Sequence, residues 1–162
     1  ASAEKFGLVR EKDRVRALEL MTRLNRPGAL LSKFDQVHSM TDVTGFALAG
    51  HTLEMAQGSS LKAVIRYKDI PKIEGVDYYI ENECMPGGTF RNFNSYGALC
   101  DMDPSYKALL CDPQTSGGLL LSVDPLAVET IADVVHGVGH DFYIIGTIEE
   151  LVEGDDKFLK VI

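Results

Sequence analysis

The sequence predicts a layered α/β or α+β sheet domain. Helical and strand-like segments alternate along the chain, which favours such a domain over a helix bundle or a β-sandwich. Hydrophobic residues make up 45% and charged residues 25% of the sequence, as in an ordinary globular protein. The 162 residues correspond to one domain, long enough to bury a core without disulfides or a structural metal.

In the first part of the chain, apolar spacing predicts a helix over 12–26, a strand over 37–43, a helix over 46–57 and a strand over 61–67. The first helix carries an apolar stripe at helical spacing and should end where Pro27 follows. In the last of these strands, apolar and polar residues alternate.

The pattern is weaker between residues 69 and 103. A helix is expected over 72–82, followed by a Gly- and Asn-rich loop over 85–97. A long irregular stretch within a compact domain is uncommon and is usually functional or mobile.

Regular patterns return in the last part of the chain. The run 119–123 is apolar and predicts a buried strand. Asp124-Pro125 has the composition of a helix start, and a helix is expected over 128–137. Strands are expected over 142–147 and 158–162.

Composition excludes several classes of protein. The net charge of −8 argues against nucleic acid as a partner, because such partners require a basic patch. No apolar run is long enough to cross a bilayer, and the N-terminus lacks the apolar stretch of a signal peptide. The three cysteines form no C-x-x-C pair, so a reduced, cytoplasmic setting is expected. The chain opens without Met, and we expect it to be part of a longer protein.

The first segment that could carry chemistry is the run Met40-Thr41-Asp42-Val43-Thr44-Gly45-Phe46. Asp42 is expected at the end of a strand, where its carboxylate could bind a hard cation such as Mg²⁺. Free amides at the start of the next helix could favour an anion beside it. The alternative is that Asp42 or Thr44 caps the helix, and on the local pattern alone capping is the commoner use of such residues.

Two further polar segments follow. The paired glycines of the first, Gly87 and Gly88, would let backbone amides approach a ligand. Its side chains could contact phosphate or sugar, namely those of Thr89, Arg91 and Asn92. The second precedes a predicted strand and could form a polar loop at the edge of a site, with the residues Gln114, Thr115, Ser116 and Gly117. Each segment could equally be a plain turn, and neither matches a standard nucleotide-binding fingerprint.

Together these segments resemble the selenophosphate synthetase (selenide, water dikinase) family. The resemblance is carried by three runs in the family's order: Met40-Thr41-Asp42-Val43-Thr44-Gly45-Phe46 continuing to Gly50-His51-x-x-Glu54-Met55, Pro86-Gly87-Gly88-Thr89-x-Arg91-Asn92, and Asp112-Pro113-Gln114-Thr115-Ser116-Gly117-Gly118-Leu119-Leu120. The family makes selenophosphate from selenide, ATP and water and releases AMP and phosphate.

The resemblance implies a three-layer α/β/α fold, that of the C-terminal domain shared with aminoimidazole ribonucleotide synthetase and partly ferredoxin-like. Residues 1–162 would then form the C-terminal domain of a two-domain enzyme. The missing N-terminal domain would hold the nucleophile, most Mg²⁺ ligands and the usual homodimer contact, so we expect no catalytic residue in this chain. Asp42 would be the one metal ligand from this domain, and Thr41, Thr44 and Gly45 would support it. The implied partners are that domain, ATP and selenide.

One departure concerns the family's usual Gly-Phe-Gly-Leu-Leu-Gly-His run, in which Ala47 and Ala49 stand here for a Gly and a Leu. Because Ala suits a helix better than Gly, we expect slight repacking and intact chemistry. The alternatives are a sister ATP-using enzyme, of the purine synthetase, thiamine-phosphate kinase or hydrogenase maturation type, and a non-catalytic interaction or oligomerisation domain.

Overall fold

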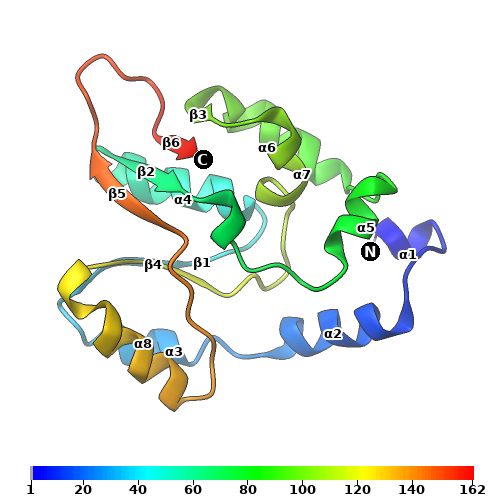
Figure 1. Ribbon diagram of the computed structural model, residues 1–162, viewed down its shortest axis with the longest axis horizontal. Coiled ribbons are helices and arrows are strands. Elements are labelled where there is room, and N and C mark those ends of the chain that lie inside the picture. The colour runs from blue at the N-terminus through cyan, green and yellow to red at the C-terminus, as the bar shows by residue number, and fades with distance from the viewer. Residues whose placement is uncertain (1) are drawn as a thin grey trace.

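The computed structural model describes residues 2–162, in which helices pack against two separate sheets (Figure 1). The strands are β1 (Val37–Asp42), β2 (Leu61–Ile65), β3 (Cys100–Asp101), β4 (Leu119–Val123), β5 (Gly146–Glu150) and β6 (Leu159–Val161). The α-helices are α1 (Ser2–Lys5), α2 (Glu11–Thr22), α3 (Pro27–Leu31), α4 (Ala47–Gly58), α5 (Val76–Glu81), α6 (Gly87–Tyr96), α7 (Lys107–Leu110) and α8 (Val128–Gly137). Short 3₁₀ turns occupy Tyr67–Asp69, Gly97–Leu99, Pro104–Tyr106 and Pro125–Ala127.

The smaller sheet is the antiparallel pair of β1 and β4, in which Asp42 lies opposite Leu119. Helices α3 and α8 cover it, as Figure 1 shows. Leu31, Ile131 and Val135 are the buried centre of this unit and pack against apolar side chains of both strands. The pairing therefore holds the end of β1, with Asp42, next to the start of β4.

The larger sheet has four strands in the order β3-β6-β2-β5. Strand β2 pairs in parallel with β6 and antiparallel with β5. The core beside this larger sheet is built from α4, the sheet itself and the segment that ends at Cys111. In this core, Leu53, Leu110 and Leu159 are almost completely buried. Helix α4 follows directly on the loop after β1, so this core fixes the far side of that loop.

The predicted fold class is confirmed, because the chain is a mixed α/β domain in which the strands divide between two sheets. The strands expected at 37–43, 61–67, 119–123 and 158–162 and the helices expected at 46–57 and 128–137 are present with small shifts at their ends. Asp124 accepts a hydrogen bond from the Leu126 N–H, which confirms its expected role at a helix start.

The prediction of a loop over 85–97 is wrong, because most of this segment forms helix α6. Gly and Asn residues disfavour a helix in isolation, but this segment places Phe93 and Tyr96 one turn apart against the larger core. Burial of these rings outweighs the weak local propensity. Pro86 directly before the helix is the start signal that marks its beginning.

The strand expected over 142–147 lies later in the chain, at β5. Phe142 packs against the smaller core and Ile145 against the larger one, so the apolar residues before β5 connect the two cores instead of pairing in a sheet. The first helix is also shorter than expected, since α2 ends at Thr22. Its predicted stripe is solvent-exposed at Leu18, Met21 and the following Leu24.

Candidate functional site

Asp42 is the last residue of β1, and its carboxylate is free. The side chain is exposed, and within residues 2–162 it takes part in no hydrogen bond or ion pair. This is the position predicted for a metal ligand at the rim of a sheet. The carboxylate does not cap α4, whose first residue is preceded by Phe46 without any side-chain cap. The capping interpretation is therefore wrong for Asp42.

The segment 112–118 is bound to the loop after Asp42 by three backbone hydrogen bonds. The N–H of Val43 donates to the carbonyl oxygen of Gly118 over 2.9 Å, and the N–H of Gly117 donates to that of Val43 over 2.9 Å. The N–H of Gln114 donates to the carbonyl oxygen of Thr44 over 3.1 Å. A Cβ on Gly117 would lie 2.9 Å from the Val43 oxygen, so only glycine fits this approach.

Helix α6 holds the same loop from the other side. The side-chain amide of Asn92 donates to the carbonyl oxygen of Gly45 over 2.9 Å and to that of Cys111 over 3.1 Å. One turn later, the Tyr96 hydroxyl donates to the carbonyl oxygen of Phe46 over 2.7 Å. Both hydrogens of the Asn92 amide are used in this way. Asn92 therefore positions the loop and has no donor left for a ligand.

Gly88 and Thr89 are packing residues. A Cβ on Gly88 would lie 2.7 Å from the ring of Pro113, so this glycine lets the start of α6 approach the 112–118 segment. Thr89 is completely buried, and its hydroxyl makes no hydrogen bond of normal geometry within residues 2–162. Burial raises the pKa of the neighbouring Asp112, an effect opposed by hydrogen bonding to Gln114 and by the nearby Thr89 hydroxyl. The three motifs thus meet at the loop that follows Asp42, through backbone hydrogen bonds and the Asn92 side chain.

Thr44 is also engaged internally. Its hydroxyl oxygen lies 3.2 Å from Nε2 of His51, and Nδ1 of His51 lies 2.8 Å from a carboxylate oxygen of Glu54. His51 is buried and hydrogen-bonded through both ring nitrogens. Because the Thr44 hydroxyl bonds to His51, the capping interpretation is wrong for Thr44 too.

Ala47 corrects one expectation. Its φ is +63°, in the left-handed region that glycine adopts without strain, although its side chain is completely buried at the first residue of α4. Replacing a family glycine by Ala at this position therefore introduces strain. The argument that Ala suits a helix is wrong here, because the residue has not yet reached helical φ.

The remaining candidates differ in how the structure uses them. The Thr41 hydroxyl donates to the carbonyl oxygen of its neighbour Asp42 over 3.2 Å. Arg91 and Thr115 are exposed and Ser116 is half-buried; within residues 2–162 no hydrogen bond or ion pair involves their side chains. Gly87 begins α6 and does not lie in a loop. Sequence reasoning missed Tyr96, whose spacing of three from Phe93 was the available signal.

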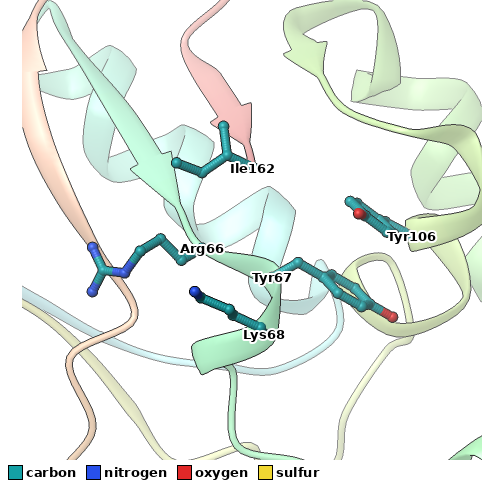
Figure 2. A pocket seen from close by; sticks show the side chains of 5 residues that line it. All are labelled: Arg66, Tyr67, Lys68, Tyr106 and Ile162. Atoms are coloured by element: carbon teal, nitrogen blue, oxygen red, sulfur yellow. The ribbon is translucent and has the colours of Figure 1, made fainter.

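A surface hollow lies apart from these motifs. It measures about 380 Å³ and is lined by residues at the ends of β2 and β6 and by Tyr106 (Figure 2). The rings of Tyr67 and Tyr106 are stacked, with their centroids 3.9 Å apart. Arg66 extends away from them, bonded to Asp69 and to the carbonyl oxygen of Ile144. A smaller hollow of about 150 Å³ adjoins the Asp42 loop between α4 and α6, next to Phe46 and Tyr96.

The donor set fits a shared cation site. No group of three or more His, Cys, Asp or Glu side chains in the described part of the chain is arranged to hold a metal by itself. Mg²⁺ commonly takes only one or two carboxylates and completes its shell with phosphate oxygens and water. The unengaged Asp42 carboxylate meets that requirement as a single protein ligand.

Within residues 2–162, no helix is long and apolar enough to span a membrane.

The sequence matches the family described as AIR synthase related protein, C-terminal domain, over residues 1–155. The chain belongs to this family. The AIR synthase related fold therefore contains the three motifs gathered around Asp42. The match confirms the predicted fold family, that of the C-terminal domain shared with aminoimidazole ribonucleotide synthetase.

The chain is also similar to proteins named selenide, water dikinase. It is 48% identical over 153 residues to the one from Salmonella typhimurium, 43% identical over 155 residues to the one from Haemophilus influenzae and 44% identical over 162 residues to the one from Pseudomonas aeruginosa. These alignments cover 94%, 95% and 99% of the chain, respectively, but only 43%, 45% and 46% of the relatives. The chain thus spans less than half the length of these curated relatives.

Proposed function

We propose that this chain is the C-terminal domain of a selenide, water dikinase, which makes selenophosphate from selenide, ATP and water and releases AMP and phosphate. The observation that carries the proposal is that three motifs far apart in the sequence are hydrogen-bonded around one free carboxylate, that of Asp42. The similarity to relatives of that name supports it.

In this proposal the chain supplies one metal ligand on a rigid loop. Asp42 would hold Mg²⁺ together with groups of a preceding N-terminal domain and ATP, and bound Mg²⁺ would neutralise negative charge on the polyphosphate. The loop is restrained by backbone bonds from Gln114 and Gly117 and by the Asn92 amide. These restraints keep the carboxylate in place without consuming it. No side chain of this domain is expected to act as the nucleophile.

The wider assembly is part of the same proposal. The N-terminal domain would hold the nucleophile and most metal ligands, the full-length enzyme would be a cytoplasmic homodimer, and the isolated chain would be inactive. An interface of two domains fits a loop whose carboxylate faces solvent here, because the second domain would complete its surroundings.

Two alternatives lead to different products. A sister ATP-using enzyme would contain the same domain but release ADP or act on another acceptor. A non-catalytic interaction or oligomerisation domain would turn nothing over. The free Asp42 carboxylate speaks against the second alternative, since a domain kept only for binding has no need of an unengaged acid on a restrained loop.

The test is phosphorus NMR on the longest native form that contains this domain, incubated anaerobically with Mg²⁺, ATP and selenide. We expect AMP, orthophosphate and a phosphorus signal coupled to selenium. ADP without that signal would overturn the proposal in favour of a sister enzyme. No turnover by a folded protein that contains both domains would overturn it in favour of a binding module.

A further inference from the structure

Three side chains form a continuous hydrogen-bonded chain from the surface to the Asp42 loop. Glu54 lies at the surface, with its carboxylate 2.8 Å from Nδ1 of His51. The imidazole is buried, with His51 only 7% exposed, and its Nε2 lies 3.2 Å from the Thr44 hydroxyl oxygen. Glu54 and His51 lie on α4, three residues apart, and thus on one face of that helix.

The order of these groups determines the direction of each hydrogen bond. An ionised carboxylate can only accept, so the bond to Glu54 requires a hydrogen on Nδ1. A neutral imidazole carries its single hydrogen on one nitrogen, which leaves Nε2 of His51 as an acceptor. The contact with Thr44 then requires the hydroxyl to donate to His51. A hydroxyl has one hydrogen, and in this arrangement it is already used.

We infer that Glu54 and His51 are positioning residues that commit the Thr44 hydroxyl hydrogen inward, so that its oxygen can only accept from a ligand. A group that reaches this oxygen must then be a donor or a cation, such as a bound water or a divalent metal ion, and not a phosphate oxygen. Thr44 lies two residues from Asp42, so both would present oxygen to the same kind of ligand. The cation part of this inference rests on the proposed function.

The direction of the bonds can be tested on the chain alone. Long-range ¹H–¹⁵N correlation spectra at pH about 8.5, where an imidazole is neutral, distinguish the two tautomers. We expect His51 with its hydrogen on Nδ1. Glu54→Gln should give a mixture, because an amide can accept from or donate to Nδ1. The exposed Glu81→Gln on α5 is the matched control and should leave the spectrum of His51 unchanged.

Either of two results would overturn the inference. A hydrogen on Nε2 in the unaltered chain would make Thr44 an acceptor from His51 and free its own hydrogen for a phosphate. An unchanged tautomer in Glu54→Gln, with the fold intact, would show that Glu54 does not control the direction.

The ligand class is tested with Mn²⁺ as the probe, in the longest native protein and in the presence of ATP. Thr44→Val should weaken Mn²⁺ binding about tenfold, whereas Thr44→Ser should preserve it within about twofold. Equal affinity in Thr44→Val would overturn the acceptor role. If the unaltered protein makes no selenophosphate, the proposed function fails while the tautomer result still stands, so the two failures are distinguishable.

Discussion

The side-chain amide of Asn92 donates to the carbonyl oxygen of Gly45 across 47 positions of sequence, at 2.9 Å. The same nitrogen reaches the carbonyl oxygen of Cys111, so one side chain joins the loop after β1 to the end of α7. Two motifs that are separate in the sequence are thereby held in one unit. Asp42, three residues before Gly45, has no such bond and keeps its carboxylate free.

Replacing Asp42 should separate folding from activity. Because the carboxylate is exposed and makes no hydrogen bond or ion pair in residues 2–162, Asp42→Asn should leave the free energy of unfolding nearly unchanged. In the full-length enzyme, turnover at limiting Mg²⁺ should fall by about 100-fold or more, since outer partners of metal ligands already cost about 10- to 100-fold. The exposed Asp35→Asn is the control. Turnover near that of the unaltered enzyme would show that Asp42 is not a ligand.

Removing the Asn92 amide should loosen the loop. Asn92→Ala leaves the carbonyl oxygens of Gly45 and Cys111 without this donor, and we expect a loss of about 1 to 3 kcal/mol in the free energy of unfolding. Asn94→Ala lies on the same helix at an exposed position and should change stability by no more than about 0.5 kcal/mol. Urea unfolding of both variants measures the difference. Equal stability would mean that the two bonds contribute nothing.

Substitution by glycine should affect stability differently at two alanines of α4, Ala47 and Ala49. Each substitution loses a buried methyl group, about 0.8 kcal/mol, and adds freedom to the unfolded chain, about 0.5 to 1 kcal/mol. At Ala47 the relief of the left-handed φ, about 1 to 2 kcal/mol, offsets these losses, so Ala47→Gly should be nearly neutral. Ala49→Gly has no such relief and should destabilise by about 2 kcal/mol. Thermal unfolding compares them, and equal losses would contradict the strain at Ala47.

Asp112 should make stability depend on pH. Burial raises its pKa above the usual value, so the folded domain keeps this proton to a higher pH than the unfolded chain. The stability it contributes is present at acidic pH and is lost as the pH rises through the folded pKa. Asp112→Asn removes that loss. Urea unfolding from pH about 3.5 to about 7 should show the variant gaining on the unaltered chain, and a difference independent of pH would refute this.

The cysteines should differ in reactivity. Burial raises the pKa of Cys100 to about 12 and also raises the pKa of Cys111, and both thiols are buried. Cys84 is half-buried near the end of α5. Iodoacetamide at pH about 8 should therefore modify Cys84 in the folded chain, and the other two only in denaturant. Peptide mass spectrometry locates the modified residues. Rapid modification of Cys100 without denaturant would contradict its placement in the core.

Much of the fold could be read from local pattern. Apolar alternation at β2 and the apolar run at β4 predicted strands, and the spacing of Ile131 and Val135 predicted α8, because in these segments the buried face has the period of the element. The three motifs and their order also indicated the family. Asp42 was placed correctly at the end of a strand, since a Thr-Gly pair and helix formers follow within a few residues.

The tertiary structure decided what local pattern cannot express. Helix α6 forms because Phe93 and Tyr96 find a core built from distant strands, and β5 begins where β2 offers a partner. The roles of Asn92 and Gly117 depend on partners 47 and 74 residues away, and the left-handed φ of Ala47 depends on the loop that precedes it. Residue types and spacing determine which groups can act, but only the packing of remote segments determines which remain free. Around Asp42, the packing of remote segments engages the neighbouring residues in hydrogen bonds and leaves the Asp42 carboxylate available.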